Sequence, residues 1–299
     1  KSDDNALEVH VRQSPISSAL SVDSAIAMKM GPARIGLYAN NLPDAETSTP
    51  LRINGVPAVI DRELDLGTGA AIYHNGNNYV FQWPTGEELV AQINGEGEDA
   101  FINITVYTFE SQANHLVGLL GNANGDANDE LRFRNGEVLP SREAYGNLSN
   151  LIGRGSGVRL PLDSAFNIYL ENLSKDYGND WRITQEESLF DYDAGQNTQT
   201  FTLSSFPSEY LALEQLSSTE LSDAQATCID RQVEPDLMEG CVFDVAFSGR
   251  SDFARAAARI SQTADILEQF GIDVPNLDQE IRNRLPGLPG GIKIPGLPF

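Results

Sequence analysis

The pattern that most constrains this chain is a series of short apolar runs, separated by turn residues, between residues 7 and 140. The first run alternates strictly, with Leu7, Val9 and Val11 on one face and polar side chains on the other, which is the two-residue period of a β-strand. Further runs follow at residues 24–30, 34–39, 51–55, 57–60, 87–93 and 101–109, and residues 70–86 have the pattern of a hairpin that turns at Asn75-Gly76. Short strands at this spacing predict a mainly β domain, either a sandwich or a barrel.

The pattern changes after residue 140. Residues 142–152, 217–231 and 251–271 have helical spacing, the second with Ser217 or Ser218 as its cap and the third closed by Gly271. Residues 166–172 and 198–203 are typical of strands. We therefore expect a β domain over residues 1–140, a smaller, helix-rich α/β module over residues 141–285, and a tail. The tail, residues 286–299, holds four prolines and four glycines, so it is a linker, an extended segment or a strand donated elsewhere.

The chain is strongly acidic, with a formal charge of −23 from 43 acidic and 20 basic residues. Such a field repels nucleic acid and anionic lipid and attracts divalent cations; the alternative is that it only keeps a secreted protein soluble. No run of 18 apolar residues is present, so we expect no membrane span. The chain begins at Lys1 without a leader, which fits either a processed mature protein or a fragment.

Two cysteines, Cys228 and Cys241, are separated by twelve residues. In an oxidising compartment they would close a short loop, worth about 3 kcal/mol by the chain-entropy estimate, and in the cytosol they would be free thiols. The three histidines lie far upstream, so a tetrahedral zinc site is not expected. We expect the disulfide.

One loop concentrates side-chain oxygens. Asn122, Asn124, Asp126 and Asn128 recur at every second residue, and residues 129 and 130 add two carboxylates. Calcium binds six to eight hard oxygens from a flexible loop, and the spacing here is not that of an EF-hand. The alternative is a hairpin turn at Asn124-Gly125 between residues 115–120 and 131–134. Three carboxylates within five residues repel one another unless a cation lies among them, which favours a metal site.

Residues 118–131, GLLGNANGDANDEL, resemble the signature of von Willebrand factor type D domains, and the runs EVHVRQSP, SAIAMKM, RINGVPA and FINITVYT are also similar to that family. The resemblance covers residues 5–140. It implies a secreted antiparallel β-sandwich with a structural calcium ion, held by side chains of Asn122, Asn124, Asp129 and Glu130 and by the backbone carbonyl of Asp126.

The chain also departs from the family pattern. Leu120 stands where the family has a cysteine, and the family's opening segment, which supplies first strands and an acidic ligand, is missing. Residues around Cys228 and Cys241 are similar to a reduced form of the eight-cysteine module that accompanies such domains.

A second ion near Asp191, Asp193 and Asn197 is an alternative to a plain polar turn, which we favour. The chain carries no nucleophile elbow, zinc-protease, phosphate-loop or dinucleotide motif, so we expect no enzyme. The function expected is a secreted, calcium-binding structural or adhesive protein whose partners are calcium, further copies of itself or other extracellular proteins. The alternatives are a scaffold domain of a secreted enzyme and a carbohydrate- or lipid-binding module.

Overall fold

The computed structural model describes residues 1–44, 47–126, 128–140 and 168–272. The chain divides into two compact units, the first made of Lys1–Phe109 with Ile183–Pro275 and the second of Glu110–Arg182 with Asn276–Phe299. The predicted boundaries after residues 140 and 285 border or fall within residues outside those described, as do the helix expected at 142–152 and the tail at 286–299. These remain predictions.

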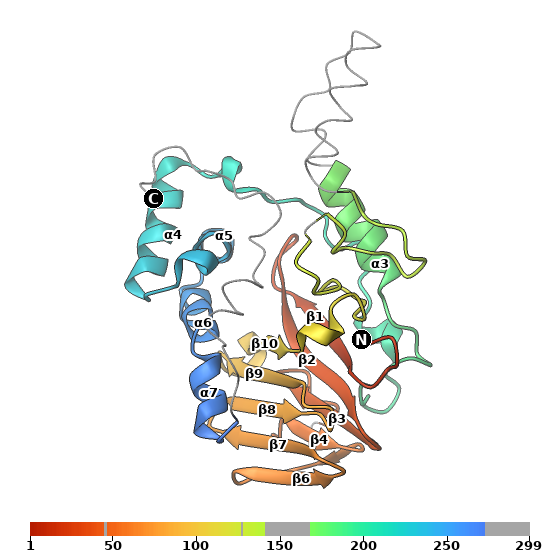
Figure 1. The fold of residues 1–299 in the computed structure, drawn as a ribbon. Coiled ribbons are helices and arrows are strands. Elements are labelled where there is room, and N and C mark those ends of the chain that lie inside the picture. The colour runs from red at the N-terminus through yellow and green to blue at the C-terminus, as the bar shows by residue number, and fades with distance from the viewer. Residues whose placement is uncertain (45–46, 127, 141–167, 273–299) are drawn as a thin grey trace. The chain divides into compact units, whose positions relative to one another are not determined.

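The first unit is built on two antiparallel sheets of five strands each (Figure 1), in which every strand pairs with its neighbour in sequence. The mainly β, sandwich-type fold is confirmed. The first sheet contains β1 (Glu8–Pro15), β2 (Ser21–Met30), β3 (Ala33–Tyr38), β4 (Leu51–Ile53) and β5 (Val56–Pro57). The second contains β6 (Glu63–Gly67), β7 (Ala70–Asn75), β8 (Asn78–Gln82), β9 (Glu88–Asn94) and β10 (Phe101–Tyr107).

The core of the sandwich is made by alternate residues of the central strands. Its largest members are fully buried: Ile26, Met28, Met30, Ile35, Leu37, Leu51, Ile72, Phe81, Leu89 and Ile102. Burial of each such side chain stabilises the fold by about 1.5–3 kcal/mol. Trp83, which is 1% exposed, donates its indole N–H to the carbonyl of Lys29 at 2.9 Å and so ties the two sheets together.

The predicted hairpin over residues 70–86 forms as β7 and β8, but its turn is shifted by one residue. Asn75 pairs with Asn78, and the positive φ falls on Gly76, at +61°. The strand β6 was not predicted, because ELDLG carries two acids within five residues and reads as a polar connection.

The first unit has one short helix between β9 and β10, and its other helices follow the sheets in the chain. In chain order, these helices are η1 (Gly97–Asp99), η4 (Thr198–Phe201), η5 (Leu213–Gln215), α4 (Ser218–Asp230), η6 (Pro235–Leu237), α5 (Met238–Ser248), α6 (Asp252–Ile260) and α7 (Thr263–Gln269). The predicted helix at 217–231 is α4, capped by Ser217 in a reciprocal box with Glu220. The predicted single helix at 251–271 is instead two helices, which break between Ile260 and Thr263.

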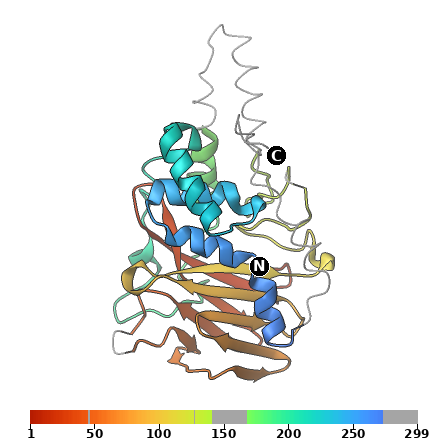
Figure 2. The ribbon, with the colours of Figure 1, turned by 90° about the vertical axis from the view of Figure 1, so that its left-hand side faces the viewer.

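The break places α6 and α7 along the outer face of the second sheet (Figure 2). Ala256 of α6 packs with Phe101, and Ile266 and Leu267 of α7 pack with Val80 and Val90. Thr263, which begins α7, hydrogen-bonds to the hydroxyl of Tyr107. Two short helices follow the twisted sheet where one straight helix would leave it.

The outer face of the first sheet is covered by residues 183–201, which we call the strap. The strap is irregular except for η4, and the strand predicted at 198–203 is therefore wrong. A 3₁₀ turn forms there instead, because the side chain of Asn197 accepts from the N–H of Gln199 at 2.9 Å and caps the turn. Within residues 183–201 the structure contains no strand.

The second unit is described at residues 110–126, 128–140 and 168–182. It contains η2 (Glu110–Gln112) and a helix that runs from residue 168 through η3 (Asn172–Tyr177) and α3 (Gly178–Asp180). The strand predicted at 166–172 is therefore wrong from residue 168 onward. Tyr169, Leu173, Tyr177 and Trp181 recur every four residues and pack against Leu139, which is a helical period.

No helix in the described ranges has the length and apolarity needed to cross a membrane.

Candidate metal centre

The acidic loop of the second unit, residues 122–130, is organised by Asx turns. The side-chain oxygen of Asn122 accepts from the N–H of Asn124 at 3.1 Å, and that of Asn124 accepts from the N–H of Asp126 at 2.7 Å. The carboxylate of Asp126 accepts in turn from the N–H of Asn128 at 3.0 Å. These local bonds explain the two-residue spacing of the sequence, because an Asx side chain reaches the backbone two residues on.

Asp129 is the point on which the loop converges. Its Oδ1 accepts from the side-chain amides of Asn124 at 2.9 Å and Asn122 at 3.3 Å, and its Oδ2 is paired with the guanidinium of Arg132. The hydrogen bond from Asn124, followed by those from Asn122 and Arg132, holds the pKa of Asp129 below its usual range. Asp129 is therefore a carboxylate at neutral pH.

Glu130 lies on the other side of the loop, against Gly121. Its Oε2 accepts from the N–H of Asn122 at 3.3 Å. Burial, and then the nearby charge of Asp129, raise the pKa of Glu130, while backbone hydrogen bonds oppose the rise. Gly121 has a φ of +85°, and a Cβ there would lie 2.5 Å from Cγ of Glu130. Only glycine allows this carboxylate to approach so closely.

The helix of the second unit supports the loop from both ends. The hydroxyl of Tyr177 donates to the carbonyl of Gly118 at 2.8 Å, and the indole of Trp181 donates to the carbonyl of Arg132 at 2.9 Å. Beyond the loop, Arg134 donates to the carbonyl of Asp180 at 2.7 Å. The loop is thus fixed to a helix whose aromatic side chains pack into a small core.

The structure brings together the five residues predicted to hold a metal: Asn122, Asn124, Asp126, Asp129 and Glu130. It does not support the simple hairpin, because in this described stretch no ladder joins residues 115–120 to residues 131–134. A different hairpin forms, between residues 131–133 and 137–139, in which the N–H of Leu139 donates to the carbonyl of Leu131. Asn122 is 3% exposed, so the loop is anchored in the unit.

The fit to calcium rests on the chemistry of the donors. The set contains carboxylate, amide and backbone oxygens, which are the hard ligands that calcium prefers. The described residues contain no group of three His, Cys, Asp or Glu side chains placed to hold a metal ion, so amide and backbone oxygens have to complete any coordination. In this arrangement the amide nitrogens and Arg132 offset the charge of Asp129. The ion pair of Arg132 with Asp129 was not predicted from the sequence, although the position of Arg132 three residues after Asp129 indicates that such a pair can form.

The second candidate cation site, at residues 191–197, is a polar turn. Asp191 is paired with Arg34 at 2.5 Å and with Arg52 at 3.6 Å. Asp193 accepts from the N–H of Ala194 at 2.7 Å, and Asn197 caps η4. The carboxylate of Asp191 already has cationic partners, so this turn is no cation site.

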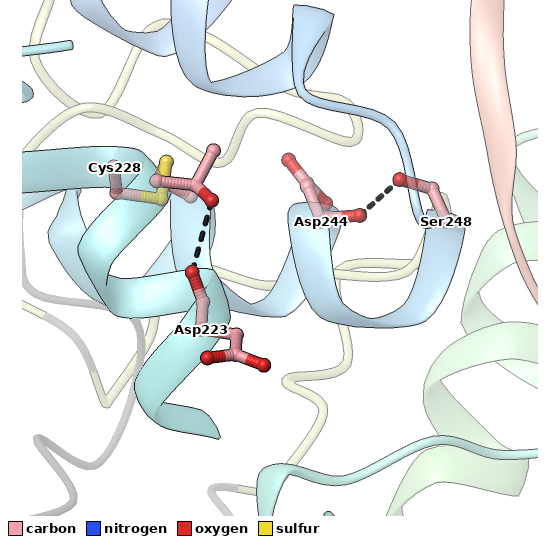
Figure 3. The surroundings of a disulfide bond; sticks show 6 residues. Asp223, Cys228, Asp244 and Ser248 are labelled. Carbon is pink, nitrogen blue, oxygen red and sulfur yellow. Dashed lines mark hydrogen bonds between the residues drawn. A yellow bond between two sulfur atoms is a disulfide. The ribbon is translucent and has the colours of Figure 1, made fainter. Parts of the chain in front are cut away.

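The two cysteines form a disulfide that joins α4 to α5 (Figure 3), with the sulfur atoms of Cys228 and Cys241 1.97 Å apart. Cys228 is 0% exposed and Cys241 is 2% exposed, in a cluster with Val233, Val242 and Val245. No free cysteine is present. Both sulfurs are shielded from solvent, which suits a structural cross-link better than a redox site.

A scan against protein-family models finds no match to this chain, and a search of curated proteins finds none either.

Proposed function

We propose that this chain is a secreted structural or adhesive protein of the von Willebrand factor type D kind, in which a calcium ion braces the acidic loop. The observation that carries the proposal is the loop itself, where the side chains of Asn122 and Asn124 converge on Asp129 and the carboxylate of Glu130 bonds to the backbone of the same turn. Asn122, Asn124, Asp129 and Glu130 would offer side-chain oxygens, and Asp126 would offer its backbone carbonyl. A bound cation would offset the negative charge of Glu130 and add to the charge that Arg132 already supplies to Asp129.

Calcium and Arg132 compete in this proposal for the same carboxylate. The guanidinium pairs with Oδ2 of Asp129, and its Nε donates to the backbone carbonyl of that residue at 3.1 Å. Half of the Asp129 carboxylate is thus engaged by a fixed cation. We expect the affinity for calcium to be moderate for this reason, since each ion must displace or share that contact.

Two properties support the extracellular part of the proposal. The buried disulfide between α4 and α5 is the kind of cross-link that persists in oxidising compartments. The formal charge of −23 keeps such a protein soluble and raises the local concentration of divalent cations. We propose self-association or binding to other extracellular proteins as the use of this module.

Calorimetric titration with calcium tests the proposal, together with thermal melting before and after chelation. Calcium at 100 times its dissociation constant would stabilise the protein by about 2.7 kcal/mol, which appears as a higher melting temperature. Asp129→Asn should abolish the heat of binding. Asp176→Asn is the matched control, because Asp176 is an exposed carboxylate of the same unit, on η3. Equal calcium affinity in both variants would contradict the proposal.

Arg132→Gln separates a metal site from a simple ion pair. If calcium uses Asp129, removal of the competing guanidinium should tighten calcium binding several-fold. If the loop is held only by the ion pair, the same variant should lower the melting temperature and leave calcium without effect.

Light scattering in the presence and absence of calcium tests the assembly part. Deletion of residues 286–299, which lie outside those described, tests whether the tail joins copies by β-augmentation. An unchanged oligomer size after the deletion would remove the tail from the proposal.

A further inference from the structure

The strap covers a sheet face that is shaped to receive it. On this face the central side chains are small, with Ala25, Ala27 and Gly36 on neighbouring strands β2 and β3, and the two alanines are 0% exposed. The ring of Tyr38 lies across Gly36, where an added Cβ would come within 2.7 Å of it. Phe190 of the strap packs edge-on against Tyr38, with the ring centroids 6.4 Å apart. The face is therefore buried only as long as the strap stays in place.

Arginines on the sheet hold the strap by its backbone and by one carboxylate. The guanidinium of Arg12 stacks on Phe201 at 3.7 Å and on Phe190 at 4.5 Å from the ring centroids. Arg34 donates to the carbonyl of Leu189 at 2.8 Å and pairs with Asp191. The N–H of Asp191 donates to the hydroxyl of Tyr38 at 2.7 Å. Each of these contacts involves at least one side chain. The strap is therefore held by side chains and does not pair with the sheet as an additional strand.

His10 on β1 adds a contact of a different kind. Its Nδ1 accepts from the N–H of Leu189 at 3.3 Å, and its Nε2 lies 3.3 Å from Oε1 of Glu8. The contact with Leu189 requires Nδ1 without a proton, so the ring is the neutral tautomer that carries its hydrogen on Nε2 and donates it to Glu8. His10 is 8% exposed. A second proton, on Nδ1, would place the N–H of the ring against the N–H of Leu189, and neither group would then have an acceptor.

The charged groups facing His10 come from three places. Glu8 lies on its own strand, Glu187 belongs to the strap, and the amino-terminal amine also faces the ring. Its partner on β2 is the uncharged Ala27. Burial lowers the pKa of His10, while the charge of Glu8 and its hydrogen bond oppose that shift. Because the docked ring binds a proton less readily than a free one, docking is at full strength above a pH of about 6.5 and weakens as the pH falls through the lowered value.

We propose that His10 is an acid-sensitive latch: protonation of its Nδ1 detaches Leu189 and loosens the strap on the outer face of the first sheet. The loosened strap opens more often and then exposes the aromatic and small apolar side chains of that face, while the core between the sheets stays closed. The device is local, because the arginine contacts that remain do not titrate in this range. Between the pKa of the free ring and the lower pKa of the docked ring, each pH unit lowers the docking equilibrium constant by up to about tenfold.

Hydrogen exchange read by mass spectrometry measures the latch on the full chain. Protection factors for residues 183–201, corrected for the intrinsic pH dependence of exchange, are compared between pH 7.5 and pH 5, with core strands β2 and β9 as the internal reference. We expect strap protection to fall at pH 5 while the protection of the core strands stays unchanged. Equal protection of the strap at both pH values would overturn the proposal.

Two variants assign the effect to His10. His10→Asn keeps an acceptor oxygen close to the position of Nδ1 and does not titrate, so the strap should stay protected at pH 5. His74→Asn is the control, since His74 lies on β7 of the other sheet and contacts the carbonyls of Ile60 and Gly76; it should lose strap protection as the unmodified chain does. A strap in His10→Asn that still opens at pH 5 would assign the response to another group and overturn the latch.

A second measurement covers the case in which His10→Asn loosens the strap at every pH. Nuclear magnetic resonance follows the ring protons of His10 in the unmodified chain, and its midpoint should coincide with the midpoint of strap opening. Midpoints that differ by a full pH unit would contradict the latch.

Discussion

Asp191→Ala is the sharpest test of how the strap is anchored. The carboxylate of Asp191 is 11% exposed and lies between Arg34, which is 34% exposed, and Arg52, which is 9% exposed. Arg34 can rehydrate when its partner is lost, whereas Arg52 cannot. Nε and Nη1 of Arg52 are buried and have no hydrogen-bond partner in the structure, and its Nη2 keeps the carbonyl of Gly55 at 2.7 Å. Leaving a buried charge without its partner costs about 3–5 kcal/mol, and the lower end applies because only one of the two arginines is trapped.

We therefore expect Asp191→Ala to lower the free energy of unfolding by about 3 kcal/mol, measured by denaturant titration followed by far-ultraviolet circular dichroism. Asp193→Ala, an exposed carboxylate of the same strap, is the control and should cost less than about 0.5 kcal/mol. Adding Arg52→Met to Asp191→Ala should recover part of the loss, since it removes the trapped charge. A cost equal to that of Asp193→Ala, or losses that simply add in the double variant, would refute this reasoning.

Three further predictions concern the disulfide and the acidic loop. Replacing Cys228 and Cys241 together by serine should lower the free energy of unfolding by about 3 kcal/mol, because the bridge closes a loop across a sequence separation of 13; an unchanged denaturation midpoint would contradict this. Gly121→Ala should destabilise the second unit far more than Gly125→Ala in thermal melts: both have a positive φ, but a Cβ meets Glu130 only at the first and has nothing within 4 Å at the second. The folded-state pKa of Glu130 is raised above its unfolded value, so Glu130 begins to bind a proton as the pH falls toward that raised pKa, and calcium binding should then release this proton. Calorimetric titrations in buffers of different ionisation heat measure the release. No release would contradict the assignment of Glu130 as a ligand.

The strands of the sandwich were predictable because their signal is local. Over residues 7–11, at the start of β1, the period of two places Leu7, Val9 and Val11 on one face. The capping box of Ser217 and Glu220 likewise predicts where α4 begins. Both signals lie within a few residues of the element that they specify, so one sequence is enough to read them.

The elements that were predicted wrongly depend on contacts that are remote in sequence. Residues 168–172 include β-branched and aromatic side chains that are typical of a strand. Tyr169 instead belongs to a row of side chains on one face of a helix, and this row packs on Leu139. Residues 198–203 alternate like a strand, yet Phe201 instead stacks on Arg12 of the first strand. Nothing near His10 in the sequence indicates that Leu189 will approach its ring.

The sequence predicted which residues form the candidate metal centre, but not which of them bond to one another. Spacing alone identifies Asn122, Asn124 and Asp126 as a cluster of oxygens. That Arg132 takes one oxygen of Asp129 depends on how the chain turns after the loop, where the carbonyl of Arg132 is fixed by Trp181.

The central claim is that calcium braces the loop after Leu120, and a calcium titration of the purified, chelator-treated protein tests it most directly. Isothermal calorimetry should show one site that is lost in Asp129→Asn, and the melting temperature should rise with calcium and fall again with chelator. A protein that takes up no calcium in the millimolar range, and whose melting curve is the same with and without chelator, would contradict the account.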